Sequence, residues 1–232
     1  MLQQTQVLRV IPKYTEFIEK YPSVEVLSKA SPASVLRIWK GMGYNRRALY
    51  LQKAAIEIVR THNGIFPKIE SELRKLPGLG IYTARAILVF AYKQEVGLVD
   101  TNIRQIITHF VFGDVPQSEK VIQEAADALV PKGKSWEWHQ ALMDYGSSEL
   151  KKIRPVAKRI RVVSKVPFKD TDRFFRGRIM DLLREKSMSE HVLVEHINKT
   201  YSKPADFIQT IIQGLVDDGL IQRIGKSIQL PE

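Results

Sequence analysis

The chain has 232 residues, 44% of them apolar, which is enough to build one large domain or a medium and a small one around hydrophobic cores. Cysteine is absent, which excludes disulfides, thiolate zinc sites and cysteine-ligated iron–sulfur clusters, so we expect neither metal nor cofactor. The net charge is +11, with 17 basic against 10 acidic side chains in residues 151–232, which favours a polyanionic partner. The sequence has no apolar run long enough to cross a bilayer and no secretory signal, so we expect an intracellular protein of the cytoplasm or nucleoid.

The first 62 residues predict helices. An apolar stripe indicates a helix over residues 2–18, and shorter helices are expected at 24–30 and 32–39, the latter capped by Ser31 with Pro32 in its first turn. A long helix should follow and end at His62, before Asn63-Gly64. The first helix begins at the first residue without a cap, from which we expect that the full protein starts upstream of Met1.

Two glycine turns carry the polar signals of this region. The turn in residues 40–48 leads into Tyr44, Arg46 and Arg47, a pattern that fits either a solvated helix start or a surface that stacks on bases and pairs with phosphates. The second turn, residues 77–80, separates a short helix over 71–76 from an apolar helix that begins near Ile81. It can be a plain connection, or a site where glycine backbone and the helix N-terminus bind a phosphate.

The stretch that starts at this turn ends on Asp100, which follows an apolar run and precedes another predicted helix. An aspartate at such a place is an N-cap, a catalytic carboxylate, or both, since capping fixes the side chain. Amphipathic helices are then expected at 101–112, 117–130 and 136–150, and no strand pattern interrupts residues 1–150.

The last third changes character. Residues 151–169 hold eight basic side chains and no acid, as expected of a solvated linker or of a segment that lies along phosphates. Residues 170–232 predict three helices and a hairpin that turns at Gly225-Lys226. We therefore predict an all-α domain over 1–150, a linker over 151–169 and a small winged-helix-like α+β domain over 170–232, an outline that fixes a shape and not a partner.

Five blocks of the sequence occur together in one known family. They are MLQQTQV (1–7), WKGMGYNRRA (39–48), LPGLGIYTARAI (76–87), VDTNIRQI (99–106) and HQALMDYG (139–146). In order and spacing they resemble the helix-hairpin-helix DNA glycosylases over about residues 1–150, most closely the adenine-specific branch, with endonuclease III and a thymine glycosylase for G·T mismatches as relatives. The resemblance implies base-excision repair: a mispaired base is flipped out of the duplex and its N-glycosidic bond is hydrolysed.

The resemblance also implies roles for single residues. Asp100 matches the aspartate that faces the sugar, Asn102 a polar neighbour that supports it, and Tyr82 the place where bifunctional relatives carry a Schiff-base lysine, so hydrolysis without strand cleavage is expected. Gln3 and Gln4 match glutamines near the extruded base, and Tyr44 matches an aromatic wedge. The further DNA-binding residues that we expect from the matching blocks are Arg46, Leu76, Gly78, Leu79, Gly80 and Thr83.

Three departures from the family pattern keep alternatives open. The glutamate that protonates the departing purine lies two residues before the Met of the first block, ahead of Met1; the four cluster cysteines are absent; and a winged-helix-like domain replaces the domain that senses 8-oxoguanine. We expect a monomeric, cluster-free adenine glycosylase acting on duplex DNA with adenine opposite guanine or 8-oxoguanine. A G·T-mismatch thymine glycosylase and a catalytically impaired protein that binds damaged DNA are the alternatives.

Overall fold

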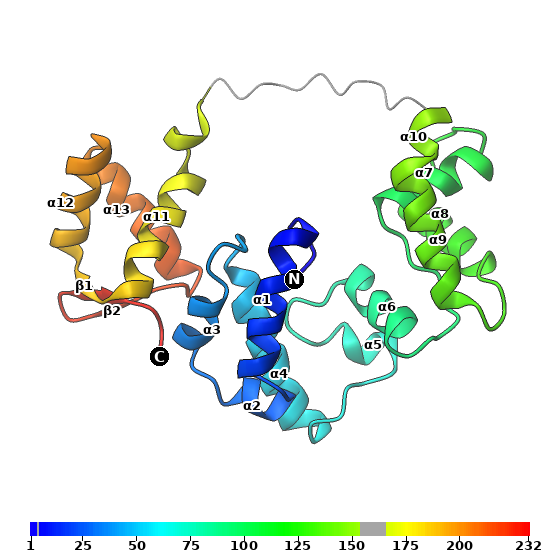
Figure 1. Ribbon diagram of the computed structural model, residues 1–232, viewed down its shortest axis with the longest axis horizontal. Coiled ribbons are helices and arrows are strands. Elements are labelled where there is room, and N and C mark those ends of the chain that lie inside the picture. The colour runs from blue at the N-terminus through cyan, green and yellow to red at the C-terminus, as the bar shows by residue number, and fades with distance from the viewer. Residues whose placement is uncertain (4, 154–165) are drawn as a thin grey trace. The chain divides into compact units, whose positions relative to one another are not determined.

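The computed structural model describes residues 1–3, 5–153 and 166–232. The chain forms two compact units, one made of Met1–Ile65 with Val163–Glu232 and the other of Phe66–Val162. Figure 1 shows helices throughout both units and short strands near the C-terminus. Among the described residues, no helix is long and apolar enough to cross a membrane.

The N-terminal part of the first unit is helical, as predicted. Its helices are α1 (Val7–Lys20), α2 (Val24–Ser28), α3 (Pro32–Ile38) and α4 (Arg46–His62). The Ser31 hydroxyl caps α3 by accepting a hydrogen bond from the Ser34 amide at 3.2 Å. Asn63 ends α4 in the left-handed conformation, with φ of 51°. Both predicted helix ends are therefore confirmed.

The predicted start of the first helix at residue 2 is wrong, because α1 begins at Val7. Arg47 explains the difference: its guanidinium donates hydrogen bonds to the carbonyls of Met1, at 3.1 Å, and Gln3, at 2.7 Å. The Thr5 hydroxyl donates to the Met42 carbonyl at 3.2 Å. The first residues are thus bound to Met42 and to Arg47 in the first turn of α4, and the carbonyls of Met1 and Gln3 accept from Arg47 instead of from helix amides.

The C-terminal part of the first unit has three helices and a small sheet. Its elements are η1 (Phe168–Asp170), α11 (Asp172–Glu185), β1 (Met188–Ser189), α12 (Glu190–Tyr201), α13 (Ala205–Asp217), β2 (Gln222–Ile224) and β3 (Ser227–Gln229). The hairpin of β2 and β3 turns at Gly225, as predicted, and β1 adds to it in the antiparallel order β1-β3-β2. The sequence did not predict β1, because a two-residue strand is too short to show alternation.

These two parts of the first unit share one hydrophobic core. Leu36 and Trp39 from the N-terminal helices are buried in the same cluster as Phe175 and Ile179 of α11. Arg184 on α11 is also buried, and it donates to the Leu36 carbonyl at 3.0 Å and to Oδ1 of Asn45 at 2.9 Å. The contact is therefore both apolar and hydrogen-bonded.

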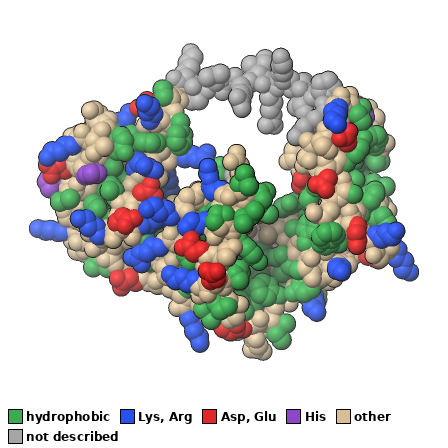
Figure 2. Space-filling model, viewed as in Figure 1, with side chains coloured by type: hydrophobic (Ala, Val, Ile, Leu, Met, Phe, Trp, Pro, Cys, Tyr) green, Lys and Arg blue, Asp and Glu red, His purple; other side chains and the backbone are tan. Residues whose placement is uncertain are grey.

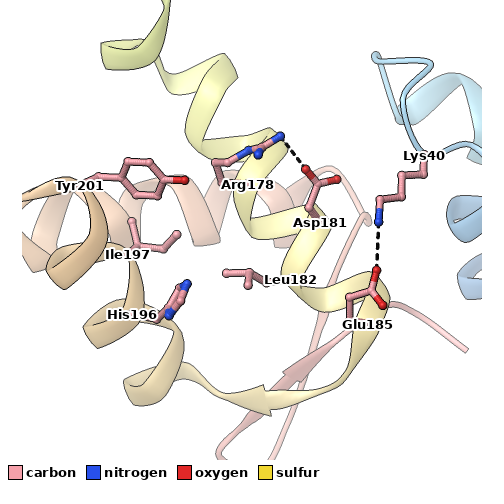
Figure 3. Close-up of a pocket in the computed structure, with 8 residues that line it drawn as sticks. All are labelled: Lys40, Arg178, Asp181, Leu182, Glu185, His196, Ile197 and Tyr201. Atoms are coloured by element: carbon pink, nitrogen blue, oxygen red, sulfur yellow. Dashed lines mark hydrogen bonds and ion pairs between the residues drawn. The ribbon is translucent and has the colours of Figure 1, made fainter. Parts of the chain in front are cut away.

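An ion pair at the surface also joins the N-terminal and C-terminal parts of the first unit. Figure 3 shows Lys40, which follows α3, reaching Glu185 on α11 across 3.0 Å, while Arg178 and Asp181 pair along α11 at 2.7 Å. Both pairs line a small hollow of about 290 Å³ beside α12. The pairs are exposed or half-buried, so they contribute little beside the buried core.

The described residues of the second unit form helices and the loops between them. It contains α5 (Glu70–Leu73), α6 (Ile81–Phe90), α7 (Thr101–Phe110), α8 (Glu119–Ala128), α9 (Ser135–Ser148) and α10 (Leu150–Ile153). Helix α7 contributes Ile103 and Ile107 to a core with Ile122 and Ala126 of α8, and side chains of α9 pack against it. Most of the basic run 151–169 lies outside the described residues, and the proposed boundaries at 150 and 170 stay predictions.

Candidate active site

The glycine turn of the second unit joins α5 to α6 as a tight hairpin. Gly78 has φ of +78°, which favours glycine, and the Leu79 amide donates to the carbonyl of buried Leu76 at 3.2 Å. Gly80 is the N-cap of α6, and among the described residues no side chain caps this helix. A Cβ built on Gly80 meets no described atom within 4 Å, so the backbone is open to an approaching ligand.

Asp100 is the N-cap of α7, as one of the sequence interpretations proposed. Its Oδ1 accepts a hydrogen bond from the Ile103 amide at 2.7 Å, and its side chain is half-buried. The cap fixes the carboxylate at the point where the chain enters the helix. Capping and a catalytic role are therefore compatible at this residue.

Tyr82 lies in the first turn of α6, within the electrostatic reach of Asp100. Burial, and secondarily the negative charge of Asp100, raise the pKa of the Tyr82 hydroxyl above its ordinary value. The phenol therefore stays neutral at physiological pH, and 38% of the residue remains exposed. Tyr82, two residues after Gly80, therefore interacts electrostatically with Asp100, and the catalytic roles of both residues stay predictions.

The backbone that leads to Asp100 is held by side chains that the sequence did not single out. The Gly97 carbonyl accepts hydrogen bonds from Arg85 at 2.8 Å and from Gln123 at 2.9 Å, while the Gly97 amide donates to Asp127 at 2.7 Å. Arg85 also pairs with Asp127, at 2.6 Å, and with Glu70, at 2.8 Å. A network of charges from α5, α6 and α8 therefore fixes the segment three residues before the carboxylate.

Gly97 is required at this point by close packing. A Cβ placed on it would lie 2.5 Å from the carbonyl carbon of Ala126 and 2.5 Å from the amide nitrogen of Asp127. Backbone atoms of a packed helix cannot move aside as a flexible side chain can. Glycine lets the segment before Asp100 lie directly against the end of α8.

His139 binds the backbone of Leu98, the residue after Gly97. Its Nε2 accepts a hydrogen bond from the Leu98 amide at 2.9 Å, while its Nδ1–H donates to the Ser135 carbonyl at 2.6 Å. Burial lowers the pKa of His139 below its ordinary value, although the Ser135 carbonyl and Asp127 act the other way. The neutral imidazole that the two bonds need is therefore the form that the fold favours.

Asn102 follows the cap in the first turn of α7 and packs against α9. A Cβ added to Gly146 of α9 would lie 2.6 Å from the Cβ of Asn102 and 3.3 Å from Cδ1 of Ile106. The close approach of the two helices therefore depends on Gly146. His139 and Gly146 both fall in the block HQALMDYG, which was the one signal in the sequence that could have identified them.

Thr83 is half-buried in the first turn of α6, and the other remaining predicted residues lie in the first unit. Tyr44 is 48% exposed and has φ of +46°, and the guanidinium groups of Arg173 and Arg47 lie 4.9 and 5.7 Å from its ring centre. Arg46 hydrogen-bonds the Tyr50 hydroxyl at 2.8 Å. Gln3 is exposed, with its carbonyl bound to Arg47, and Gln4 lies outside the described residues.

The residues present do not fit the iron–sulfur cluster that the family resemblance implies. Such a cluster is held by cysteine thiolates, and the sequence contains none. Within the described part of the chain, no group of three His, Asp or Glu side chains is placed to bind a metal ion either.

The glycine hairpin before α6 and the capped carboxylate of Asp100 are the two features that the resemblance to helix-hairpin-helix DNA glycosylases implies. The chain belongs to the HhH-GPD superfamily of base excision DNA repair proteins, whose family model matches residues 1–132. The all-helical glycosylase fold, with a small sheet near the C-terminus, agrees with the predicted fold class.

Similar sequences agree with this assignment. The chain is 34% identical over 81% of its length to the adenine DNA glycosylase of Mycolicibacterium smegmatis, of which the match covers 70%. It is 40% identical to the adenine DNA glycosylase of Mycobacterium tuberculosis (strain H37Rv) over 64% of the chain and 50% of that relative, and 36% identical to the human adenine DNA glycosylase over 71% and 31%. The matches thus span from about three tenths to seven tenths of these relatives' length.

Solved structures share the fold. A thermostable thymine-DNA glycosylase superposes with a TM-score of 0.59 at 27% identity, over 63% of the chain and 70% of that structure. Endonuclease III in a non-covalent complex with DNA superposes with a TM-score of 0.58 at 22% identity, over 66% and 72%, a likeness of the fold alone.

Proposed function

We propose that this protein is a monofunctional adenine DNA glycosylase, which hydrolyses the N-glycosidic bond of adenine mispaired with guanine or 8-oxoguanine. The observation that carries the proposal is the Asp100 carboxylate, which is fixed as the N-cap of α7 and interacts electrostatically with Tyr82 in the first turn of α6. Adenine DNA glycosylases are the relatives at 34 to 40% identity described above.

The chemistry needs a fixed negative charge near the deoxyribose. As the bond from C1′ to the base breaks, positive charge develops on the sugar ring, and a carboxylate held against it stabilises this oxocarbenium-like state. Water then adds to C1′ and its proton is transferred to the departing adenine, so the products are free adenine and an abasic site. The hydrogen bond from Arg85 to the Gly97 carbonyl and the hydrogen bond from the Ile103 amide to Asp100 hold the carboxylate in place before the substrate arrives. This avoids reorganisation during the reaction.

Tyr82 accounts for the expected lack of strand cleavage. A Schiff base with the opened sugar requires a primary amine, and the neutral Tyr82 phenol supplies none. The abasic product should therefore stay intact until alkali is added. The hairpin amides around Gly80 are proposed to bind a DNA phosphate, with Gln3, Tyr44 and Arg46 contacting the duplex near the extruded base.

The T·G-mismatch activity is the second candidate, because the chain shares 27% identity with a thymine-DNA glycosylase structure. Duplexes with A·8-oxoG, A·G and T·G pairs, treated with alkali after incubation, test both. We expect breaks at adenine in the first two duplexes. Breaks only at thymine would select the thymine activity, and binding of all three without breaks would select the non-cutting alternative.

The proposal includes a cluster-free monomer that works where the cellular DNA lies, in the cytoplasm or nucleoid. Iron analysis of the purified protein should give less than one iron per chain, and about four would contradict it. Sedimentation of the protein with and without duplex tests whether it is a monomer.

A further inference from the structure

A cavity of about 540 Å³ lies within the first unit, where the loop before α4 meets α11 and the end of α13. It is lined by Gln3, Gly43, Tyr44, Asn45, Arg46, Arg47, Arg173, Arg176, Gly177, Leu215 and Leu220. None of these described lining residues is acidic. On the face drawn in Figure 2, Lys and Arg side chains are frequent over the part that carries α11 to α13.

The four arginines are only partly neutralised. Arg46 and Arg176 both pair with Asp218, Arg46 at 3.3 Å, so two guanidinium groups share one carboxylate. Arg47 donates to backbone carbonyls and to the Thr5 hydroxyl, which carry no charge. Among the described residues, no carboxylate lies within ion-pairing distance of Arg173. The cavity therefore keeps a net positive charge that an anionic ligand would match.

Tyr44 is presented at the edge of this cavity in a conformation that costs free energy. Its φ of +46° is unusual for a bulky residue, and glycines at 41 and 43, with φ of +87° and +70°, flank it in the loop. Arg173 of α11 lies 4.9 Å from its ring centre, a cation–π distance. The C-terminal part of the chain thus contacts the predicted wedge residue directly.

Apart from Gln3 and Asn45, the rest of the lining is apolar or lacks a side chain. Leu215 and Leu220 are buried, and Gly43 and Gly177 have no Cβ to fill the space. A phosphate alone would need neither this volume nor an apolar wall. An apolar wall, an aromatic edge and a guanidinium rim together match a nucleotide, whose base stacks while its phosphate pairs with arginine.

We propose that this cavity binds one unstacked nucleotide of the DNA substrate, so that Arg173 and Arg176 make the winged-helix-like part a DNA-recognition element. The inference rests on the proposed function in that it takes DNA as the substrate. It goes beyond the hairpin and Asp100, because it places a second nucleotide site in the other compact unit.

Gly177 allows a sharp test. A Cβ at Gly177 meets no described atom within 4 Å and its φ is ordinary for a helix, so a side chain can enter the cavity without a clash at its base. Gly177→Glu places a carboxylate among the arginines, while Gly177→Gln fills the same space without charge. Gln209→Glu, on an exposed position of α13 outside the cavity, gives the same change of net charge.

Duplex binding is measured by fluorescence anisotropy with the full chain, and dAMP binding by chemical-shift changes. We expect Gly177→Glu to weaken duplex binding about 10-fold or more and Gly177→Gln less, with Gln209→Glu within about 2-fold, since charge-assisted phosphate contacts are strong. Arg173→Ala should weaken dAMP binding, and Arg173→Lys should restore it only in part, because lysine lacks the flat guanidinium.

Equal binding by Gly177→Glu and Gln209→Glu, with both folded by circular dichroism, would overturn the inference. The inference would also fail if a glutamate decapeptide changed the chemical shifts of the cavity residues while dAMP did not. The cavity would then be a site for an acidic protein segment. If the wild-type chain releases no base but Gly177→Glu still loses duplex binding, the proposed activity fails and the nucleotide site stands.

Discussion

The amide of Ile103 donates a hydrogen bond to Oδ1 of Asp100 across 2.7 Å, so the carboxylate that we propose to act in catalysis is also the N-cap of helix α7. The two roles need different properties of the same side chain. Capping needs only an oxygen acceptor, whereas stabilising a positive sugar needs a negative charge. Substitution can therefore separate them.

Asp100→Asn should leave the fold nearly unchanged and remove the activity. Asparagine caps about as well as aspartate, so the free energy of unfolding should change by less than about 1 kcal/mol. Loss of the charge should slow adenine release about 10² to 10³-fold under single-turnover conditions. Asp100→Ala is the comparison, because it should also lose about 1 kcal/mol of stability with the cap. An Asn variant as fast as wild type would exclude the electrostatic role.

Gly80→Ala tests whether DNA approaches the hairpin backbone. The added methyl group meets no described protein atom within 4 Å, and Gly80 has φ of −81°, so stability should be kept. A close phosphate would be pushed away, and we expect duplex affinity to fall about 5-fold or more, in line with the loss of one or two charge-assisted hydrogen bonds. Melting temperature and anisotropy titrations are the measurements. Unchanged affinity would mean that the phosphate binds elsewhere.

Gly97→Ala should be costly in stability, in contrast to Gly80→Ala. Its methyl group would collide with backbone atoms of residues 126 and 127 at 2.5 Å, and overpacking of this kind costs about 1 to 3 kcal/mol. Because the displaced segment carries Asp100, base release should slow as well. Urea denaturation and single-turnover kinetics measure both effects. A variant as stable as wild type would show that the clamp around Gly97 is looser than the distances indicate.

His139 predicts a pH dependence of stability. Because its folded-state pKa lies below the ordinary value of about 6.5, the unfolded chain binds more protons as the pH falls. Its contribution is complete above about pH 6.5 and is lost as the pH falls towards the folded-state pKa, with a slope of at most about 1.4 kcal/mol per pH unit.

His139→Gln should flatten this slope, and urea unfolding at pH 8, 6.5 and 5 measures it. A slope that His139→Gln does not change would assign the pH dependence to other groups.

Tyr82→Lys should change the reaction type. A lysine at this position has an amine next to the site of Asp100, so borohydride should trap a covalent adduct with DNA after base release. The wild-type chain and Tyr82→Phe should give no adduct. Trapping by the wild-type chain would contradict the monofunctional assignment.

Local chemistry explains what the sequence predicted well. The caps at Ser31, Asn63 and Asp100 and the glycine turns at 78 and 225 depend on a few neighbouring residues, and all five were read correctly from the sequence. Catalytic and DNA-binding roles of the site residues stay predictions, because no ligand tests them.

Long-range contacts explain what the sequence missed. Three helices supply the side chains that bind residues 97 and 98, namely Arg85, Asp127 and His139. No local sequence pattern predicts such contacts. The start of α1 was mistaken for a similar reason, since Arg47, more than forty residues away, binds the carbonyls that a helix would have used. Contacts of this kind are visible only once the chain is folded.

The first compact unit is assembled from both ends of the chain, with Leu36 and Phe175 in one core. During synthesis the ribosome releases residues 1–65 long before residues 166–232. The apolar surface of the early helices therefore stays exposed until the C-terminal helices are synthesised. The second unit is continuous in sequence, so its core can form without this delay. A stop codon near residue 150 would therefore leave the opening helices without their counterpart, and we expect such a truncated product to aggregate or be degraded.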